Sequence, residues 1–210
     1  MKRIIVVCTF LALCAGILGC GGGKRVMVPP RINLKSHEVI GIIEFKCTHE
    51  GKLGPLATRD FTESIRRDQG MIRIIDLGEE KEALKAVNMK KLDRDAYQAI
   101  GDKYEVNTIF AGELKISDIR PKIDIGLAFG ILSFRAEVDA SLAVRMIEIS
   151  SGASVWNSTA SASREIGGVT IFGGKNFAFN AEDPDESYGE LLDVLIDRTS
   201  RDFQVTWERR

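Results

Sequence analysis

The clearest pattern of hydrophobic and polar positions lies in residues 136–164. Between residues 137 and 146 every even-numbered position is apolar, while the odd-numbered positions are mostly polar. A period of two residues is typical of a strand with one buried face. Ser150, Ser151 and Gly152 follow, and Val155 and Trp156 then begin a second segment that continues with small residues. The pattern predicts two long antiparallel strands joined by a tight turn.

The remaining apolar patterns predict helices that alternate with short strands. Leu53, Ala57, Phe61 and Ile65 are four residues apart and form one apolar stripe of a helix. We expect strands at 38–45, 71–75 and 106–115 and helices at 54–68, 79–89, 93–103 and 184–203, with 203–207 either a short strand or packed on the domain. The order β-α-β-α-α-β-β-β-α predicts an α/β sandwich with a mixed sheet.

Composition and charge limit the function classes. A chain of 210 residues with 44% apolar residues is long enough for one domain with a substantial core. Its 29 basic residues are balanced by 30 acidic ones, and no basic stripe is interleaved with aromatic residues. We therefore expect no nucleic-acid partner.

The N-terminal residues are expected to lie outside the domain. Lys2 and Arg3 precede an apolar run at 4–17, which is too short to cross a membrane. Residues 17–20, Ile-Leu-Gly-Cys, resemble a bacterial lipobox, in which the cysteine is lipidated and becomes the mature N-terminus. We therefore expect a lipoprotein signal peptide at 1–19, a lipidated N-terminus at Cys20 with a linker to residue 36, and a domain at 37–207.

The lipidated cysteine is expected to tether the protein to a membrane. Several acyl chains on one cysteine anchor a protein stably, since each buried methylene contributes about 0.8 kcal/mol. By resemblance to bacterial lipoproteins, Gly21 after Cys20 favours the periplasmic face of the outer membrane. The alternative is a plain secretory signal peptide with an incidental cysteine.

No motif for catalysis or metal binding emerges. His37 and His49 lack partners at metal-ligand spacing, and Cys47 is the only cysteine left in the mature chain. Residues 168–175 approach a phosphate-binding loop, but the lysine is one position late and asparagine follows it. We expect no enzyme, no metal and no cofactor.

Several segments resemble the curli-secretion-channel (CsgG-like) family, whose domain is similar in fold to the N-terminal domain of TolB and to penicillin-binding-protein activator lipoproteins. Residues 99–118 are similar to a helix and strand of that family. Residues 141–156 are similar to its hairpin, with Arg145, Ile147, Gly152 and Trp156 in matching places. The resemblance extends over about 38–203. It implies a ring-forming lipoprotein anchored in the outer membrane.

Two glycine-rich apolar segments flank the predicted hairpin, where channel members of that family insert hairpins into the membrane. In 119–135, apolar residues at odd positions alternate with polar or small ones, as in a transmembrane β-strand. In 166–180, apolar residues precede and follow a Gly-Gly-Lys-Asn turn. The candidate contact residues are Ile123, Ile125, Leu127, Phe129, Ile131, Val169, Ile171, Phe177 and Phe179.

The sequence leaves two alternatives for these segments, insertion into the membrane and packing on protein. Each is shorter than the roughly 20 residues of a membrane-spanning hairpin, unless it borrows from the neighbouring strands. Four strands from one chain would also leave open edges in lipid, so insertion requires an oligomer. Otherwise both segments pack on the domain or on a partner.

The leading functional hypothesis is a lipid-anchored, homo-oligomeric envelope protein that serves export or assembly of a surface structure with an envelope protein partner. The alternative is a monomeric regulatory module that binds a periplasmic enzyme, as the penicillin-binding-protein activators do. The short linker, residues 21–34, keeps the domain near the membrane and argues against this alternative.

Overall fold

The central feature of the fold is one mixed β-sheet. The computed structural model describes residues 24–48, 53–117, 120–126, 131–171 and 184–209. They divide into two compact units, one of residues 30–204 and one that joins the N-terminal residues up to 29 to residues 205–210. The larger unit holds the sheet and the helices. The smaller unit holds a two-stranded ribbon of β1 (Arg25–Val28) and β9 (Thr206–Arg209).

The sheet of the larger unit has the order β4-β2-β5-β7-β6, with β3 paired to β5 and β8 paired to β7. Strand β2 runs parallel to β4 and β5, whereas β7 runs antiparallel to β5, β6 and β8. The strands are β2 (Val39–Ile42), β3 (Lys46–Cys47), β4 (Arg73–Asp76), β5 (Thr108–Ile116), β6 (Arg120–Gly126), β7 (Ile131–Glu148) and β8 (Ser154–Ile171).

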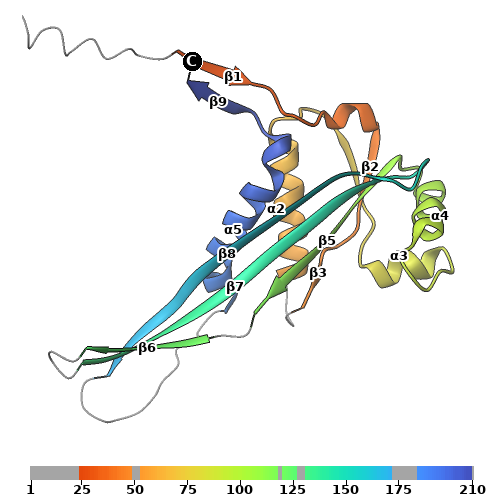
Figure 1. Cartoon of the computed structure of the whole chain (residues 1–210). Coiled ribbons are helices and arrows are strands. Elements are labelled where there is room, and N and C mark those ends of the chain that lie inside the picture. The colour runs from red at the N-terminus through yellow and green to blue at the C-terminus, as the bar shows by residue number, and fades with distance from the viewer. Residues whose placement is uncertain (1–23, 49–52, 118–119, 127–130, 172–183, 210) are drawn as a thin grey trace, which may run out of the picture. The chain divides into compact units, whose positions relative to one another are not determined.

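Helices cover both faces of this sheet (Figure 1). Helices α2 (Leu53–Arg67) and α5 (Pro184–Ser200) bury apolar residues against one face, together with the inner halves of β7 and β8. Helices α3 (Glu80–Ala86) and α4 (Arg94–Tyr104) pack with Ile109 and Ile147 on the other face. The predicted α/β sandwich with a mixed sheet is confirmed. No helix among the described residues is both long enough and apolar enough to cross a membrane.

An aromatic cluster forms the centre of the larger core. The ring of Phe61 on α2 lies 5.5 Å from Phe110 on β5 and 6.4 Å from Phe203, which ends the 3-10 helix η2 (Arg201–Phe203). Phe203 lies in turn 4.6 Å from Trp156 on β8. These ring pairs are edge-on or tilted, the geometry that aromatic quadrupoles favour. The cluster joins a helix, two strands and the end of the C-terminal helical segment.

Gln69 ties together two chain segments that are remote in sequence. Its side chain is 4% exposed. Its Oε1 accepts from the backbone N–H of Leu34 at 2.9 Å, and its Nε2 donates to the carbonyls of Ile32 and Phe203, both at 2.8 Å. Buried backbone groups that would otherwise lack partners are thereby satisfied.

The long hairpin closes at the predicted glycine. Gly152 has φ of +66°, a conformation in which side chains are strained, and its N–H donates to the Glu148 carbonyl at 2.9 Å. The Glu148 N–H donates to the Ala153 carbonyl at 2.9 Å, which continues the ladder into the turn. The strands therefore begin their pairing at a fixed register.

The structure differs from the sequence prediction at both ends of the domain. The region expected to be linker contains β1 and a 3-10 helix, η1 (Leu34–His37), whose Leu34 is fully buried. The domain therefore begins near residue 30 rather than residue 37. Strand β1 pairs with β9 across nearly the whole chain length, and such distant pairing leaves no local signal.

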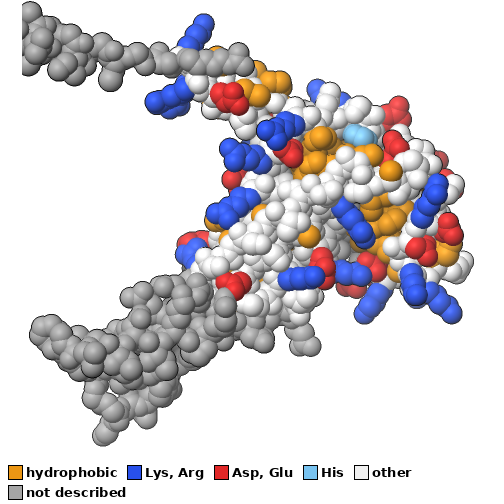
Figure 2. Space-filling model, viewed as in Figure 1, with side chains coloured by type: hydrophobic (Ala, Val, Ile, Leu, Met, Phe, Trp, Pro, Cys, Tyr) orange, Lys and Arg blue, Asp and Glu red, His pale blue; other side chains and the backbone are white. Residues whose placement is uncertain are grey.

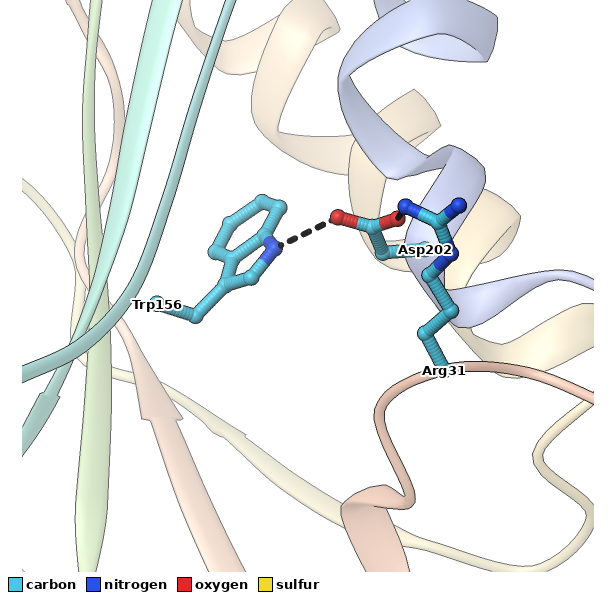
Figure 3. Close-up of polar contacts among 3 residues, drawn as sticks. All are labelled: Arg31, Trp156 and Asp202. Carbon is cyan, nitrogen blue, oxygen red and sulfur yellow. Dashed lines mark hydrogen bonds and ion pairs between the residues drawn. The ribbon is translucent and has the colours of Figure 1, made fainter.

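We predict that Asp202 stabilises the root of the hairpin. Its Oδ2 accepts from Trp156 Nε1 at 3.1 Å, and its Oδ1 pairs with Arg31 at 3.5 Å (Figure 3). Asp202→Ala removes the acceptor of a buried indole N–H, so the free energy of unfolding should fall by about 1–3 kcal/mol. Arg31→Ala is the control, because that side chain is 83% exposed and its ion pair is worth about 0–1 kcal/mol. Urea unfolding followed by Trp fluorescence measures both, and equal effects would contradict the prediction.

Candidate membrane- or partner-contacting surface

The chemistry-bearing residues of the sequence are scattered in the structure. The described residues contain no group of three His, Cys, Asp or Glu side chains that could hold a metal ion. His37 Nδ1 lies 3.0 Å from Thr108 Oγ1, and Cys47 is half-buried at the end of β3. His49 and the lipidation candidate Cys20 lie outside the described residues.

Acidic residues gather where β2 and β4 end. Burial raises the pKa of Glu44, and the carboxylates of Glu79, Asp76 and Glu82 raise it further. Lys46 pairs with Glu80 at 2.8 Å in the same region, beside an open hollow of about 720 Å³. This ion pair offsets part of the negative charge. Among the described residues, no buried side-chain nitrogen or oxygen is left without a hydrogen-bond partner, so no unpaired group there identifies a ligand.

The candidate contact segments belong to one extension of the sheet. The inner part of β7, residues 140–148, pairs with β5. Its outer part, residues 131–137, pairs with β6 in place of β5. Strand β8 pairs with β7 along both parts, to Ile171 opposite Leu132. The two segments that the sequence presented as separate are therefore neighbouring strands of a three-stranded outer sheet (Figure 1).

Apolar and polar residues occupy alternate register rows of this outer sheet. Residues that are paired across strands share a face, and successive rows belong to opposite faces. The rows of apolar residue types are Ile123–Phe134–Val169 and Ile125–Leu132–Ile171, and the rows between and beside them are Asp124–Ser133–Thr170 and Lys122–Arg135–Gly168. One face of the outer sheet therefore carries apolar residue types, and the opposite face carries mostly polar ones, with Ile131 as an exception at the start of β7.

A bulge in β8 keeps the apolar rows on one face. Ala136 pairs with Ile166 but Arg135 pairs with Gly168, so Gly167 is an extra residue in β8. Beyond it, odd-numbered β8 residues pair with even-numbered β7 residues. Val169 and Ile171 therefore share a face with Leu132 and Phe134. Glycine in a strand is typical of such bulges.

The sequence prediction for residues 119–131 needs one correction. A single alternation grouped Ile131 with Ile123 and Ile125. The structure divides the stretch between β6 and β7, and Ile131 pairs with Gly126, in the row next to that of Ile125. Leu132 and Phe134, which the alternation did not identify, take its place. The chain direction reverses between Gly126 and Ile131, and this reversal changes which residue numbers share a face.

The candidate residues fall in three groups. Ile123 and Ile125 lie in β6, and Val169 and Ile171 in β8, where pairing through β7 brings them into common rows. Ile131 begins β7 in a different row. Leu127, Phe129, Phe177 and Phe179 lie outside the described residues.

Strand β8 forms an edge of the sheet along its inner part. Among the described residues, β7 is the only strand paired with β8. The Asp139 carbonyl accepts from Ser117 N–H at 2.8 Å, so odd-numbered β7 residues direct their backbone groups away from β8. Their β8 partners therefore direct theirs to the open edge. Accordingly, the Ser161 carbonyl accepts from Arg198 Nη1 at 2.7 Å.

The open edge of β8 runs beside α5. Arg164 pairs with Glu190 of α5, and a hollow of about 440 Å³ lies between the strand and the helix. The backbone groups of Asn157, Thr159 and Ser163, whose side chains are exposed, also belong to this edge. An edge of this length is a template for pairing with another chain.

Comparisons with known proteins found distant similarity to several solved bacterial structures. No protein-family model matches the chain, and no curated protein matches it. A variant of the PelC dodecamer from Paraburkholderia phytofirmans is 14% identical, covers 87% of this chain and 98% of its own, and has a TM-score of 0.42. Lipoprotein GNA1162 from Neisseria meningitidis is 11% identical, with 76% and 95% covered and a TM-score of 0.41. The LpoB C-terminal domain from Escherichia coli is 12% identical, with 73% and 94% covered and a TM-score of 0.35.

These likenesses are too distant to assign a family or a function. Two of the similar structures, GNA1162 and a minor lipoprotein from Acinetobacter baumannii, are bacterial lipoproteins by name. The resemblance to the curli-secretion-channel family stays a prediction from the sequence. Function is therefore inferred from the residues of this chain.

We predict that the apolar rows of the outer sheet must be covered by lipid or by protein. Ile171→Asp places a charge in an apolar row, and Thr170→Asp places the same charge in the adjacent polar row. Ile171→Asp should reduce the fraction of protein held in membranes or oligomers at least tenfold, whereas Thr170→Asp should leave it unchanged. The membrane-bound fraction is measured by sedimentation after an alkaline wash, in a Cys20→Ser background. The oligomeric fraction is measured by light scattering in mild detergent. Identical behaviour of the two variants would contradict the prediction.

Proposed function

We propose that this protein is a lipid-anchored component of the bacterial envelope, held by Cys20 on the periplasmic face of the outer membrane. Its domain forms a homo-oligomer, and the assembly serves export or assembly of a surface structure. The protein is not an enzyme in this proposal. Its working parts are the anchor, the open edge of β8 and the outer sheet.

The signal for anchoring lies in the order of its parts. Two basic residues, an apolar run and Ile17-Leu18-Gly19-Cys20 follow one another as in bacterial lipoproteins. More than one acyl chain on the cysteine supplies the two hydrophobic signals that stable anchoring requires.

The observation that supports a homo-oligomer is the open edge of β8. Among the described residues, the outward backbone groups of Asn157, Thr159 and Ser163 face no paired strand, whereas the Ser161 carbonyl accepts from Arg198. The exposed side chains of Asn157 and Thr159 are uncharged, so a neighbouring strand meets no side-chain charge at these two positions. Pairing at this edge in an orientation that points the outer sheets of adjacent subunits the same way would place their apolar rows side by side.

The alternative function, a regulatory module for a periplasmic enzyme, makes a different prediction for the assembly state. A module of this kind acts as a monomer at the end of a long tether. Strand β1 begins at Arg25, so only four residues separate it from Cys20. That spacing favours a protein that works beside the membrane.

We predict that a proline on the open edge of β8 separates the subunits. Thr159→Pro removes an outward N–H and no bond to β7, and edge strands tolerate proline at such positions. Self-association should weaken at least tenfold, while Thr159→Ala, which keeps the N–H, should leave it unchanged. Mass photometry of protein solubilised in mild detergent measures the subunit number, and circular dichroism checks the fold. A monomeric unsubstituted protein would overturn the proposal and favour the regulatory module.

We predict that lipidation of Cys20 determines membrane attachment. Cys20→Ser removes the sulfur that would carry the lipid. The protein should therefore leave the outer-membrane fraction, and it should appear as an unprocessed precursor or in the soluble fraction. Cys47→Ser is the matched control, because Cys47 lies within the domain at the end of β3. Intact-mass measurement of the mature protein detects the added acyl groups. An unmodified Cys20 would sink the lipoprotein assignment.

A further inference from the structure

The β1–β9 ribbon has two chemically different faces. Its antiparallel register pairs Arg25 with Arg209 and Met27 with Trp207 in alternate rows. The rows between them hold Val26 opposite Glu208 and Val28 opposite Thr206. Alternate rows belong to opposite faces of a ribbon. One face therefore presents a Met–Trp pair beside an Arg–Arg pair, and we call it the Trp207 face.

The Trp207 face is open to solvent. Trp207 is 63% exposed and Met27 is 56% exposed, whereas the three uncharged residues of the other face are each half-buried. Arg25, Arg209 and the adjacent Lys24 are exposed as well. Figure 2 shows hydrophobic and basic side chains side by side on the ribbon. Large apolar side chains are here exposed where a strand pair could have turned them inward, which is a mark of a contact surface.

We propose that the Trp207 face lies on the phospholipid surface beside the lipid anchor. The inference rests on the proposed anchoring through Cys20. Four residues, three glycines and a lysine, separate Cys20 from Arg25. Even fully extended, five residue steps span about 18 Å, so an anchored Cys20 holds the ribbon within reach of the headgroups.

The residue types fit that position. Tryptophan is enriched at membrane–water interfaces, because its ring is amphipathic. Arginine binds phosphate oxygens through two parallel N–H groups, and each basic residue near an anionic surface adds about 1 kcal/mol of attraction. A free two-stranded ribbon is at best marginally stable in water. Contact with lipid would add the buried apolar surface that the ribbon lacks.

A second copy of the chain is a poorer occupant for this face. Two Trp207 faces in contact would bring two Arg–Arg pairs together, and the register places no acidic residue in those rows. The one acidic residue of the ribbon, Glu208, lies in a row of the opposite face. Anionic headgroups supply the counter-charge that a second copy does not.

The experiment uses the two tryptophans of the chain. Trp156 is 7% exposed and hydrogen-bonded in the core, so changes at a membrane report on Trp207. Protein purified from membranes is reconstituted into vesicles of phosphatidylethanolamine and phosphatidylglycerol (3:1), with and without bromine on the acyl chains. We expect brominated lipid to quench the Trp207 emission at least twofold, and Trp207→Phe to abolish that component. Arg25→Gln combined with Arg209→Gln should reduce the quenching, and Met71→Ala, at a site 98% exposed in the larger unit, should not.

Flotation of the same samples separates this inference from the proposed anchor. Protein that floats with vesicles but shows unquenched Trp207 retains its anchor and overturns the ribbon inference alone. Trp207 shielded from aqueous acrylamide yet unquenched by brominated lipid would place a protein on this face, which also overturns it. Protein that neither floats nor is quenched overturns both. Quenching without a detectable acyl group on Cys20 would support the ribbon contact and overturn the anchor.

Discussion

The packing of Trp156 against Phe203 is the contact that holds the β7–β8 hairpin to the helical part of the domain. Phe203 follows α5 directly, and Trp156 lies two residues into β8, so their rings at 4.6 Å join the C-terminal helix to the root of the hairpin. Phe61 and Phe110 pack on Phe203 from α2 and β5. The Asp202 carboxylate accepts a hydrogen bond from the indole N–H of Trp156 and so orients the ring. The side chain of Gln69 donates to the carbonyl of Phe203. These contacts hold the end of the hairpin near its turn in the core, where Met146 of β7 pairs with Trp156 in the register that both strands follow outward to Ala136 and Ile166.

That register has a consequence at the other end of the hairpin. The residues Val138, Leu142 and Val144 of β7 are buried under the helices, and they are even-numbered like Leu132 and Phe134. The apolar face that α5 covers therefore continues into the outer sheet. Without the bulge at Gly167, Val169 and Ile171 would fall on the opposite face, and the apolar rows would be interrupted. The extra glycine thus keeps the apolar residue types of β8 in the same rows as those of β7 from the helix-covered part of the sheet into the outer part.

The sequence predicted what local patterns encode. The alternation of residues 137–146 and the glycine at 152 were enough to identify the hairpin and its turn, and the helical stripes were enough for the sandwich. The prediction from sequence was wrong where the structure depends on pairing between strands that are distant in the chain or on the reversal between two strands. Nothing near Arg25 shows that it will pair with Arg209, and one alternation through Gly126 and Gly130 concealed a reversal of the chain. The role of Asp202 was also hidden, because its partner Trp156 is 46 residues away.

Either lipid or another protein could cover the apolar rows of the outer sheet. Both cases lead to the same requirement, a second strand at the β8 edge. An uncovered apolar sheet face in water is unfavourable by roughly 25 cal/mol for each Å² exposed. If lipid covers it, every backbone group at depth must be hydrogen-bonded, and within the described part of the chain only β7 pairs with β8. If protein covers it, the same sheet of another copy offers a face with the same pattern. In the proposed function, both routes would therefore begin with pairing at the β8 edge.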